Sequence, residues 1–545
     1  MEVESEPMLS AQGKPATGAA TEGAGGPGEV VVDSGGSELA KFLQFLGPGI
    51  LVAAVYVDPG QIVVDMESGS TFGYKLLWAC LLANLMGLMF QHLCSRLSVV
   101  TSRNLAEECR LEYPQGVRIF LWLTVELASI AADVGYVMGT ATALSILFGI
   151  ELHWGVLITG LDTFVALGLQ FWGIRKVELL VGVLFTCIIA AYFMEITLIS
   201  PTASEVADGL LPRLWHRNSK YSYGVWLELL CANLGAAVCP PNFYLQSALV
   251  LTRRIERTDK EVRSAFRHNF YETAFCLGIA TAINLVMLIL AGTVFFPDRV
   301  VSLEQGATLL EQTLGGTARS AFAVAMLCAG QSSSLSGVLS TQYIMEGFFE
   351  LSLPSWLIRL VTRLVAISPA FYIVYTYGPE SAAEMIEQAQ VVVNFVVPFT
   401  VIPLTKFLSS ELKMGQFRLS PALKMACWLS AAVAILLNLL SMCQTLLGLE
   451  EELGAAVAYP LLALSLGLYL GMSAYLMRRE VVVGQHAHLP SAGPNRAREA
   501  WLCSALKQIH VMYYVGGALL ATAMGALMWL DVLAPRYNRM AGGII

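Results

Sequence analysis

Apolar residues recur along the chain in runs whose length matches the thickness of a bilayer. Between residues 43 and 477 these runs are separated only by short polar segments, and a helix of about 20 apolar residues crosses the hydrocarbon core of a membrane. The pattern predicts twelve spans, at 43–70, 76–99, 117–147, 155–172, 176–199, 225–252, 269–294, 318–343, 355–376, 386–408, 423–447 and 455–477. We therefore expect an all-α, multi-span membrane protein.

Two of these spans contain helix-breaking residues in their middle. The first has Asp58-Pro59-Gly60-Gln61 inside its apolar run, and the sixth has Cys239 followed by two prolines. Proline removes a backbone donor and clashes with the preceding turn, so both helices should break there. Interruptions at matching positions five spans apart indicate two inverted repeats, here 43–199 and 225–408, with a binding site at the membrane midplane.

The two ends of the chain differ in composition from this core, which we place at residues 41–480. Residues 1–40 are rich in Gly, Ala, Ser and Glu, and we predict a disordered cytoplasmic tail. Residues 481–545 are interpreted as a cytoplasmic linker, a thirteenth span at 511–530 and a short tail. The alternative for the apolar run at 511–530 is a helix that lies on the bundle.

Charge and composition set the class of protein and its surroundings. With 56% hydrophobic and 14% charged residues, the chain is not a soluble globular protein. Basic residues concentrate in the predicted cytoplasmic segments, above all in Arg253 to Arg267, which we interpret as a solvated linker; the N-terminus is therefore expected on the cytoplasmic side. A net charge of -8 gives no reason to expect nucleic acid. We expect a monomer in a lipid bilayer, either the plasma membrane or an internal one, that is no enzyme and holds no resident cofactor.

The broken helices bring together groups that suit a divalent cation. A carboxylate at membrane depth is costly, which makes Asp58 a functional candidate. Gln61 and Asn242 offer amide oxygens, the unwound backbone around Ala236 offers carbonyls, and Cys239 offers a sulfur. One carboxylate among neutral oxygens suits Mg²⁺ or Mn²⁺ that keeps part of its water shell. The alternative for Cys239 is a small packing residue at a helix break.

Further polar residues within the spans are candidates for a proton relay. Glu126 and Asp133 are seven residues apart, so they share a helix face, and Arg363 is a candidate partner for one of them. Gln331 and Gln390 are amides that could face the same cavity. The alternative for each is a satisfied structural contact.

A series of motifs between Phe45 and Arg479 resembles one family of transporters. The motifs are, in order, GPGILVAAVYVDPG, LWLTVELASIAADVGYVMGTA, WGIRKVE, FYLQSALV, AGQSSSLSG, MEGFF, TRLVAI and AQVVVNFVVPFTVIPL. They are similar to the motifs of the NRAMP family (natural resistance-associated macrophage proteins), which move divalent transition metals coupled to protons. The resemblance implies a LeuT-like fold in which spans 1–5 and 6–10 form the inverted repeat.

The resemblance also implies roles for particular residues. Asp58 would coordinate the metal, Ala236 would lend its backbone carbonyl, and Gln390 would approach when the site closes. Asp133 would lie on the proton route, with Glu126 and Arg363 nearby.

Four positions depart from the family pattern. Gln61 replaces an Asn, Cys239 replaces a Met, Pro241 replaces a His, and Tyr136 replaces a Glu. A missing thioether removes the ligand that favours transition metals, and the missing His and Glu remove titratable groups. The pattern is similar to NRAMP-related magnesium transporters, which implies transport of Mg²⁺ and Mn²⁺ with weak or no proton coupling. The alternatives are a proton-coupled Mn²⁺/Fe²⁺ importer and a non-transporting metal sensor.

Overall fold

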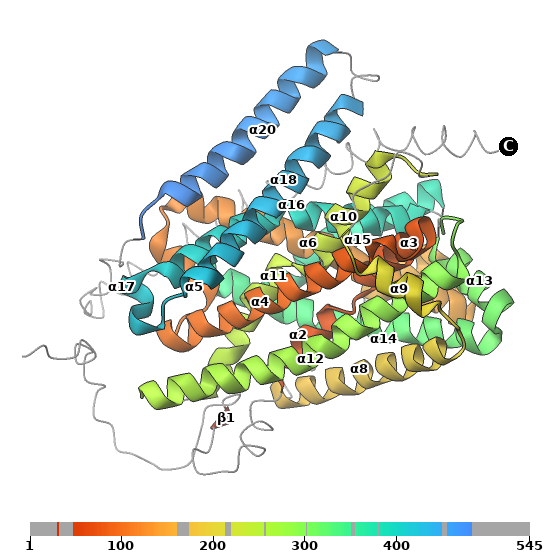
Figure 1. The fold of residues 1–545 in the computed structure, drawn as a ribbon, viewed down its shortest axis with the longest axis horizontal. Helices are drawn as coiled ribbons and strands as arrows, with labels where there is room; N and C mark the ends of the chain where they lie inside the picture. Colours follow the sequence, from red (N-terminus) through yellow and green to blue (C-terminus); the bar gives the residue numbers. More distant parts are fainter. Residues whose placement is uncertain are drawn as a thin grey trace, which may run out of the picture.

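Long helices packed side by side form most of the protein (Figure 1). The computed structural model describes residues 30–31, 47–160, 174–212, 220–254, 258–300, 302–349, 355–378, 381–448 and 455–481. Most of the predicted N-terminal tail, most of the predicted fourth span and the apolar run at 511–530 lie outside the described residues. Within those residues, eight helical segments are long and apolar enough to cross a membrane.

The first and sixth predicted spans are each divided into two helices. The main helices are α2 (Pro48–Val55), α3 (Pro59–Phe72), α4 (Leu77–Thr101), α6 (Gln115–Phe148), α8 (Ile174–Thr197), α10 (Tyr223–Ala237), α11 (Pro240–Leu249), α12 (Asp259–Val294), α14 (Gly316–Phe348), α15 (Ser355–Tyr377), α16 (Ser381–Ser409), α18 (Pro421–Gly448) and α20 (Ala455–Arg478). Short helices connect them: η1 (Gly73–Leu76), α5 (Leu105–Glu112), α9 (Ala203–Gly209), η2 (Val250–Thr252), α13 (Leu303–Leu314), α17 (Glu411–Met414) and η3 (Gly415–Phe417).

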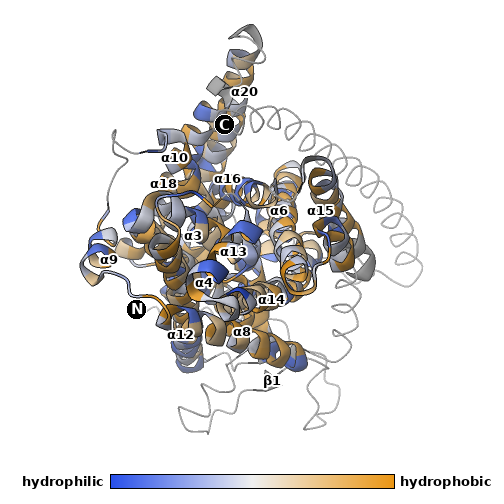
Figure 2. Ribbon diagram, turned by 90° about the vertical axis from the view of Figure 1, so that its right-hand side faces the viewer, coloured by the Kyte–Doolittle hydropathy of each residue, from blue (hydrophilic) through white to orange (hydrophobic). Residues whose placement is uncertain are grey.

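The connecting helices mark the two ends of the bundle. In Figure 1, α5 and α17 lie at one end and α9 and α13 at the other, and α18 and α20 lean away from the remaining helices. Figure 2 looks along the bundle and shows hydrophobic residues along the outer helices. Exposed hydrophobic residues include Leu179 and Phe193 of α8 and Phe275 of α12. An apolar perimeter is what a lipid environment requires, because lipid tails offer no hydrogen-bond partners.

The helix α12 begins earlier than the hydropathy pattern predicts. Its predicted span starts at residue 269, but the helix starts at Asp259, where the Thr258 side chain accepts a hydrogen bond from Glu261 N. Its first turns are polar, so they extend the helix beyond the apolar run from which the span was predicted. Part of the segment interpreted as a linker is therefore helix, with an N-cap and two acidic residues in its first turn.

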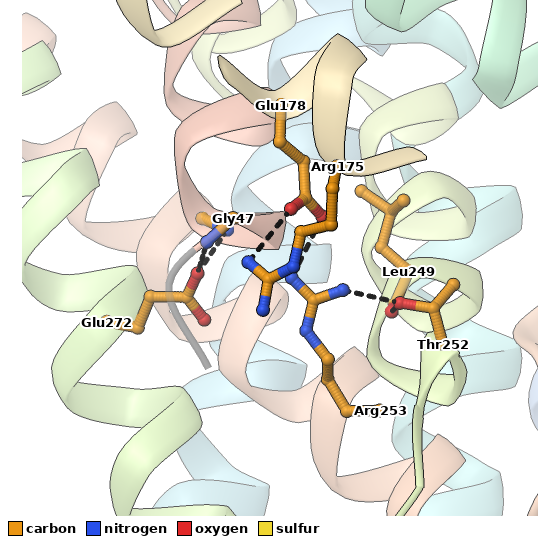
Figure 3. Close-up of polar contacts among 8 residues, drawn as sticks. Gly47, Arg175, Glu178, Leu249, Thr252, Arg253 and Glu272 are labelled. Atoms are coloured by element: carbon orange, nitrogen blue, oxygen red, sulfur yellow. Dashed lines mark hydrogen bonds and ion pairs between the residues drawn. The ribbon is translucent and has the colours of Figure 1, made fainter. Parts of the chain in front are cut away.

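Arg253 is not a solvated linker residue, which corrects the sequence interpretation. Its side chain is buried, and its Nη2 lies 2.9 Å from Glu178 Oε1 of α8. Arg175 Nη1 lies 3.2 Å from the other oxygen of the same carboxylate (Figure 3). The buried guanidinium is tolerated because it is paired with a carboxylate.

A second carboxylate holds the start of α2. Glu272 of α12 accepts hydrogen bonds from both Gly47 N and Gly49 N at 2.8 Å (Figure 3). Glu272 thus acts as an N-terminal cap supplied by another helix, with its charge at the positive end of the α2 dipole.

Close to these contacts lies a short strand pair. The strand β1 (Val30–Val31) pairs in parallel with β2 (Arg253–Arg254). The fold is otherwise helical among the described residues, so the all-α class predicted from the sequence describes it apart from this two-residue ladder.

Candidate metal site

Asp58 lies at the junction between α2 and α3 and is buried. Its backbone is extended, and its Oδ1 accepts a 2.6 Å hydrogen bond from Gln61 N, so it is the N-cap of α3. Pro59 follows as the first helical residue, a position where a missing N–H costs nothing. The same proline leaves the carbonyl of Val55 without its usual donor four residues on. The sequence Asp-Pro therefore ends one helix and starts the next.

Side chains from neighbouring helices bind the backbone carbonyls of α2. Ser336 Oγ donates to Leu51 O at 3.1 Å, and Ser333 Oγ donates to Ala54 O at 3.2 Å. Asn284 Nδ2 donates to Tyr56 O at 3.0 Å. Buried backbone groups must find partners, and the polar residues of α14 and α12 supply them.

The second break separates α10 from α11. Pro240 and Pro241 have no N–H, so the carbonyls of Ala236 and Ala237 have no helical donor four residues on. Cys239 is the N-cap of α11 and is buried, and its side chain makes no capping hydrogen bond. This junction therefore offers free carbonyl oxygens and a thiol that is not used to cap the helix.

The two breaks lie together, and Gln390 of α16 lies beside them. The Cys239 thiol and the Asp58 carboxylate are close enough to interact electrostatically. A side chain at Gly60 would overlap the Gln390 amide, so glycine at this position allows the close approach. The Gln390 Nε2 atom is buried and has no hydrogen-bond partner among the described residues. Asp58, Cys239 and Gln390 therefore belong to one buried polar site.

The two other predicted amides also lie near the breaks. Gln61 donates from Nε2 to Asp65 Oδ1 at 2.9 Å, while its Oε1 has no partner among the described residues. Asn242 donates its backbone N–H to Cys239 O at 3.1 Å, and its Nδ2 is likewise without a partner in the described part of the chain. The Gln61 oxygen is thus available to a cation, whereas the Asn242 amide nitrogen can only donate a hydrogen bond, for example to a water molecule of the cation.

Asp65 was not identified from the sequence. It is fully buried, and it lies seven residues after Asp58, two helical turns along the same face of α3. That spacing is the signal that could have identified it.

Three of the relay candidates lie near one another, because Asp133 is paired with Arg363 and interacts electrostatically with Glu126. Asp133 Oδ1 lies 3.5 Å from Arg363 Nη1. Glu126 is fully buried, and neither of its oxygens has a hydrogen-bond partner among the described residues. Tyr136 is buried near Asp58 and Cys239. Gln331 is half-buried on α14.

Pro241 stands where the family motif has a histidine, and its carbonyl accepts a 2.7 Å hydrogen bond from Ser340 Oγ. Within the described residues, no three His, Cys, Asp or Glu side chains come together in a way that could hold a metal ion. A cation at this site would therefore depend on one carboxylate, backbone carbonyls, amides and a sulfur.

The family model described as "Natural resistance-associated macrophage protein-like" matches residues 49–444. The chain belongs to the Nramp family. It is 38% identical over 409 residues to Metal transporter Nramp3 of Oryza sativa subsp. japonica, covering 73% of each chain. It is also 38% identical over 423 residues to the divalent metal cation transporter MntH of Bradyrhizobium diazoefficiens, covering 77% of this chain and 93% of that protein.

Solved structures agree with this family membership. A manganese transporter from Eremococcus coleocola superposes with a TM-score of 0.72 at 31% identity, covering 83% of this chain and 96% of that one. Mhp1, a nucleobase-cation-symport-1 transporter, shares the fold with a TM-score of 0.50 at 14% identity, covering 79% of this chain and 92% of that one. This Nramp chain is an integral multi-pass membrane protein and a divalent metal cation transporter, not an enzyme.

Proposed function

We propose that this Nramp protein moves both Mn²⁺ and Mg²⁺ through the site at Asp58, with weak or no coupling to protons. The observation behind this proposal is the ligand set at the two helix breaks: one carboxylate, carbonyls freed by Pro240 and Pro241, and a cysteine where the family has a methionine. Hard oxygen ligands accept Mg²⁺ and Mn²⁺ alike, and a partly hydrated ion needs few protein ligands.

The loss of titratable groups supports weak proton coupling. Tyr136 and Pro241 stand at the positions of the family's glutamate and histidine, and neither titrates near neutral pH. Asp133 remains, but it is already paired with Arg363. The N-terminus on the cytoplasmic side and a monomeric state remain predictions.

An ion-competition assay tests the proposed selectivity. Purified protein in proteoliposomes should take up Mn²⁺, and millimolar Mg²⁺ should both slow that uptake and enter the vesicles itself. A matched sample of Asp58→Asn should show neither effect. The magnesium assignment is wrong if Mn²⁺ enters while Mg²⁺ neither enters nor competes.

The second candidate is a proton-coupled Mn²⁺/Fe²⁺ importer, in which the sulfur of Cys239 takes the place of the thioether. The similarity to MntH and to a manganese transporter supports it. It requires acidification of the compartment that receives the metal. A pH-sensitive dye inside the vesicles distinguishes the two candidates during Mn²⁺ uptake, and uptake of any ion excludes a non-transporting sensor.

A further inference from the structure

An arginine and several carboxylates meet at the α9/α13 end of the bundle. Arg299, in the segment between α12 and α13, places Nη2 3.0 Å from Glu387 Oε2 of α16 and 3.6 Å from Glu67 Oε2 of α3. Both glutamates are at least 98% buried. The guanidinium thus bridges two helices that also border the Asp58 site.

Two more carboxylates surround the same guanidinium. Glu228 of α10 and Glu384 of α16 both interact electrostatically with Arg299, and Gln388 Nε2 donates to Glu228. Burial lowers the pKa of Arg299, but the carboxylates of Glu67, Glu387 and Glu228 raise it by more, so its net shift is upward. Four carboxyl groups therefore surround one guanidinium, and carboxyl oxygens are the ligands that a divalent cation such as Mg²⁺ or Mn²⁺ takes.

The carboxylates of this group lie on three of the helices that carry the metal site, α3, α10 and α16. Along α3, Glu67 is nine residues beyond Asp58; along α10, Glu228 is eight residues before Ala236; along α16, Glu387 is three residues before Gln390. All three displacements run toward the end where α9 and α13 lie (Figure 1). The group therefore covers the site from that end.

Some of the carboxylate oxygens have room for another partner. Glu387 Oε1 is buried and accepts no hydrogen bond from the described residues, and the buried Glu67 Oε2 has only the 3.6 Å ion pair with Arg299, which is too long for a hydrogen bond. Buried carboxylate oxygens normally have one. The arginine segment itself is fastened to helices of the site region: Val300 N donates to Ser70 Oγ at 3.2 Å, and Arg299 N donates to Tyr221 Oη at 3.1 Å.

We propose that Arg299 is the gate residue at this end of the pathway, and that its guanidinium occupies the place a passing divalent cation takes between Glu67 and Glu387. In the closed state the arginine holds α3 against α16. When these helices separate, a cation exchanges with the guanidinium on the carboxylates and passes on to Asp58. This inference extends the proposed function, since it assigns the residues that admit the cation to the same site.

Cys239 provides a test that does not depend on transport. It lies behind the gate and is 3% exposed, so a membrane-impermeant thiol reagent added from the α9/α13 side should reach it slowly. In Arg299→Gln the labelling of Cys239, followed by peptide mass spectrometry, should rise about fivefold or more, because the tie between the two helices is lost. Arg299→Lys keeps the charge and should stay close to the wild type.

Arg319→Gln is the matched control. Arg319 forms an ion pair with Glu311 at 2.7 Å and joins α14 to α13, away from the three helices of the site. Its loss should leave the labelling of Cys239 unchanged. Because Arg299→Gln leaves two buried carboxylates without a cation, the double variant Arg299→Gln/Glu387→Gln is measured as well, and it should also label rapidly while eluting as a folded protein.

Transport supplies the second measurement. Glu387→Gln removes one of the carboxylates that draw the cation in, so the Mn²⁺ concentration for half-maximal uptake should rise several-fold, while Arg319→Gln leaves it unchanged. If Cys239 is labelled at the same rate in Arg319→Gln, Arg299→Gln and the double variant, the proposal that Arg299 is the gate residue is wrong. The labelling result is independent of which ion is carried, so it separates failure of the gate from failure of the proposed Mg²⁺ selectivity.

Discussion

Asp58 is both the N-cap of α3 and the carboxylate at the first helix break. Its Oδ1 accepts the capping hydrogen bond from Gln61 N. Asparagine can make the same cap without the charge. The two contributions can therefore be separated by substitution.

We expect Asp58→Asn to fold with nearly the thermal stability of the wild type and to lose Mn²⁺ binding, because the site then has only neutral ligands. Asp58→Ala should lose the cap as well, at a cost of about 1 kcal/mol of folding stability. Isothermal titration calorimetry and thermal unfolding in detergent measure the two effects. Mn²⁺ binding of wild-type strength in Asp58→Asn would show that this carboxylate is not a ligand.

Cys239 should decide part of the preference between ions. Cys239→Met introduces a thioether, a soft ligand that Mg²⁺ avoids, so Mg²⁺ should inhibit Mn²⁺ uptake less than in the wild type. Cys239→Ser, similar in size but with a hard oxygen, is the control and should increase the inhibition. If both variants compete like the wild type, the side chain at position 239 does not contact the ion.

At the residue scale, a polar residue of the site can be predicted from the sequence when it interrupts an apolar run next to a helix-breaking proline. Asp58 and Cys239 meet that condition, and the structure places them together. Asn84 and Asn284 do not, yet they bind each other at 3.2 Å, and Asn284 binds the carbonyl of Tyr56. Such partners cannot be found from one sequence, because the contacts join residues 200 or more positions apart.

At the scale of elements, the two prolines of the second break determine how much backbone is free. Pro240→Ala would give the carbonyl of Ala236 a helical donor and let α10 run toward α11. The carbonyl would then have to give up a hydrogen bond worth about 1 kcal/mol to bind a cation. We expect Mn²⁺ affinity to fall by about three- to tenfold.

Pro369→Ala is the control for this variant. Pro369 lies inside α15 and leaves that helix continuous. Its replacement should leave Mn²⁺ affinity, measured by titration calorimetry, as it is. An affinity that falls equally in both variants would mean that proline replacement acts through general packing and not through the carbonyl of Ala236.

Prolines and apolar runs also explain which elements could be predicted. The division of the first and sixth spans follows from backbone chemistry at Pro59, Pro240 and Pro241, and the structure contains both divisions. The start of α12 was placed ten residues late, because its first turns are polar and lie outside the apolar pattern. The short helices α5, α9, α13 and α17 connect spans and were not predicted, since hydropathy alone does not register them.

At the scale of the whole molecule, buried ion pairs join helices that are far apart in the chain. Arg253 and Glu178 connect the end of α11 to α8, and Arg299 connects α3 to α16 at the opposite end of the bundle. Removing one member of a buried pair leaves an uncompensated charge, at a cost of about 3–5 kcal/mol. Each end of the bundle thus has a buried ion pair that joins helices distant in the chain.

We expect a double-mutant cycle on Arg253 and Glu178 to be strongly non-additive. Arg253→Gln and Glu178→Gln should each destabilise the protein, and the double variant should be less destabilised than the sum, by about 1 kcal/mol or more. Thermal unfolding in detergent measures all four proteins. The pair Arg319 and Glu311, which is partly exposed, should give a nearly additive cycle. Additivity at Arg253 and Glu178 would contradict a coupled buried pair.

The single carboxylate of Glu272 that receives both Gly47 N and Gly49 N has a consequence for how the protein moves. Two backbone donors from the first turn of α2 share one acceptor atom, so neither N–H group can move away from Glu272 without disturbing the hydrogen bond of the other. We therefore expect α2 to move away from Glu272 of α12 as one rigid unit. A partial displacement of α2 would leave the buried carboxylate of Glu272 without its hydrogen-bond donors. Partly displaced positions of α2 should therefore be scarcely populated.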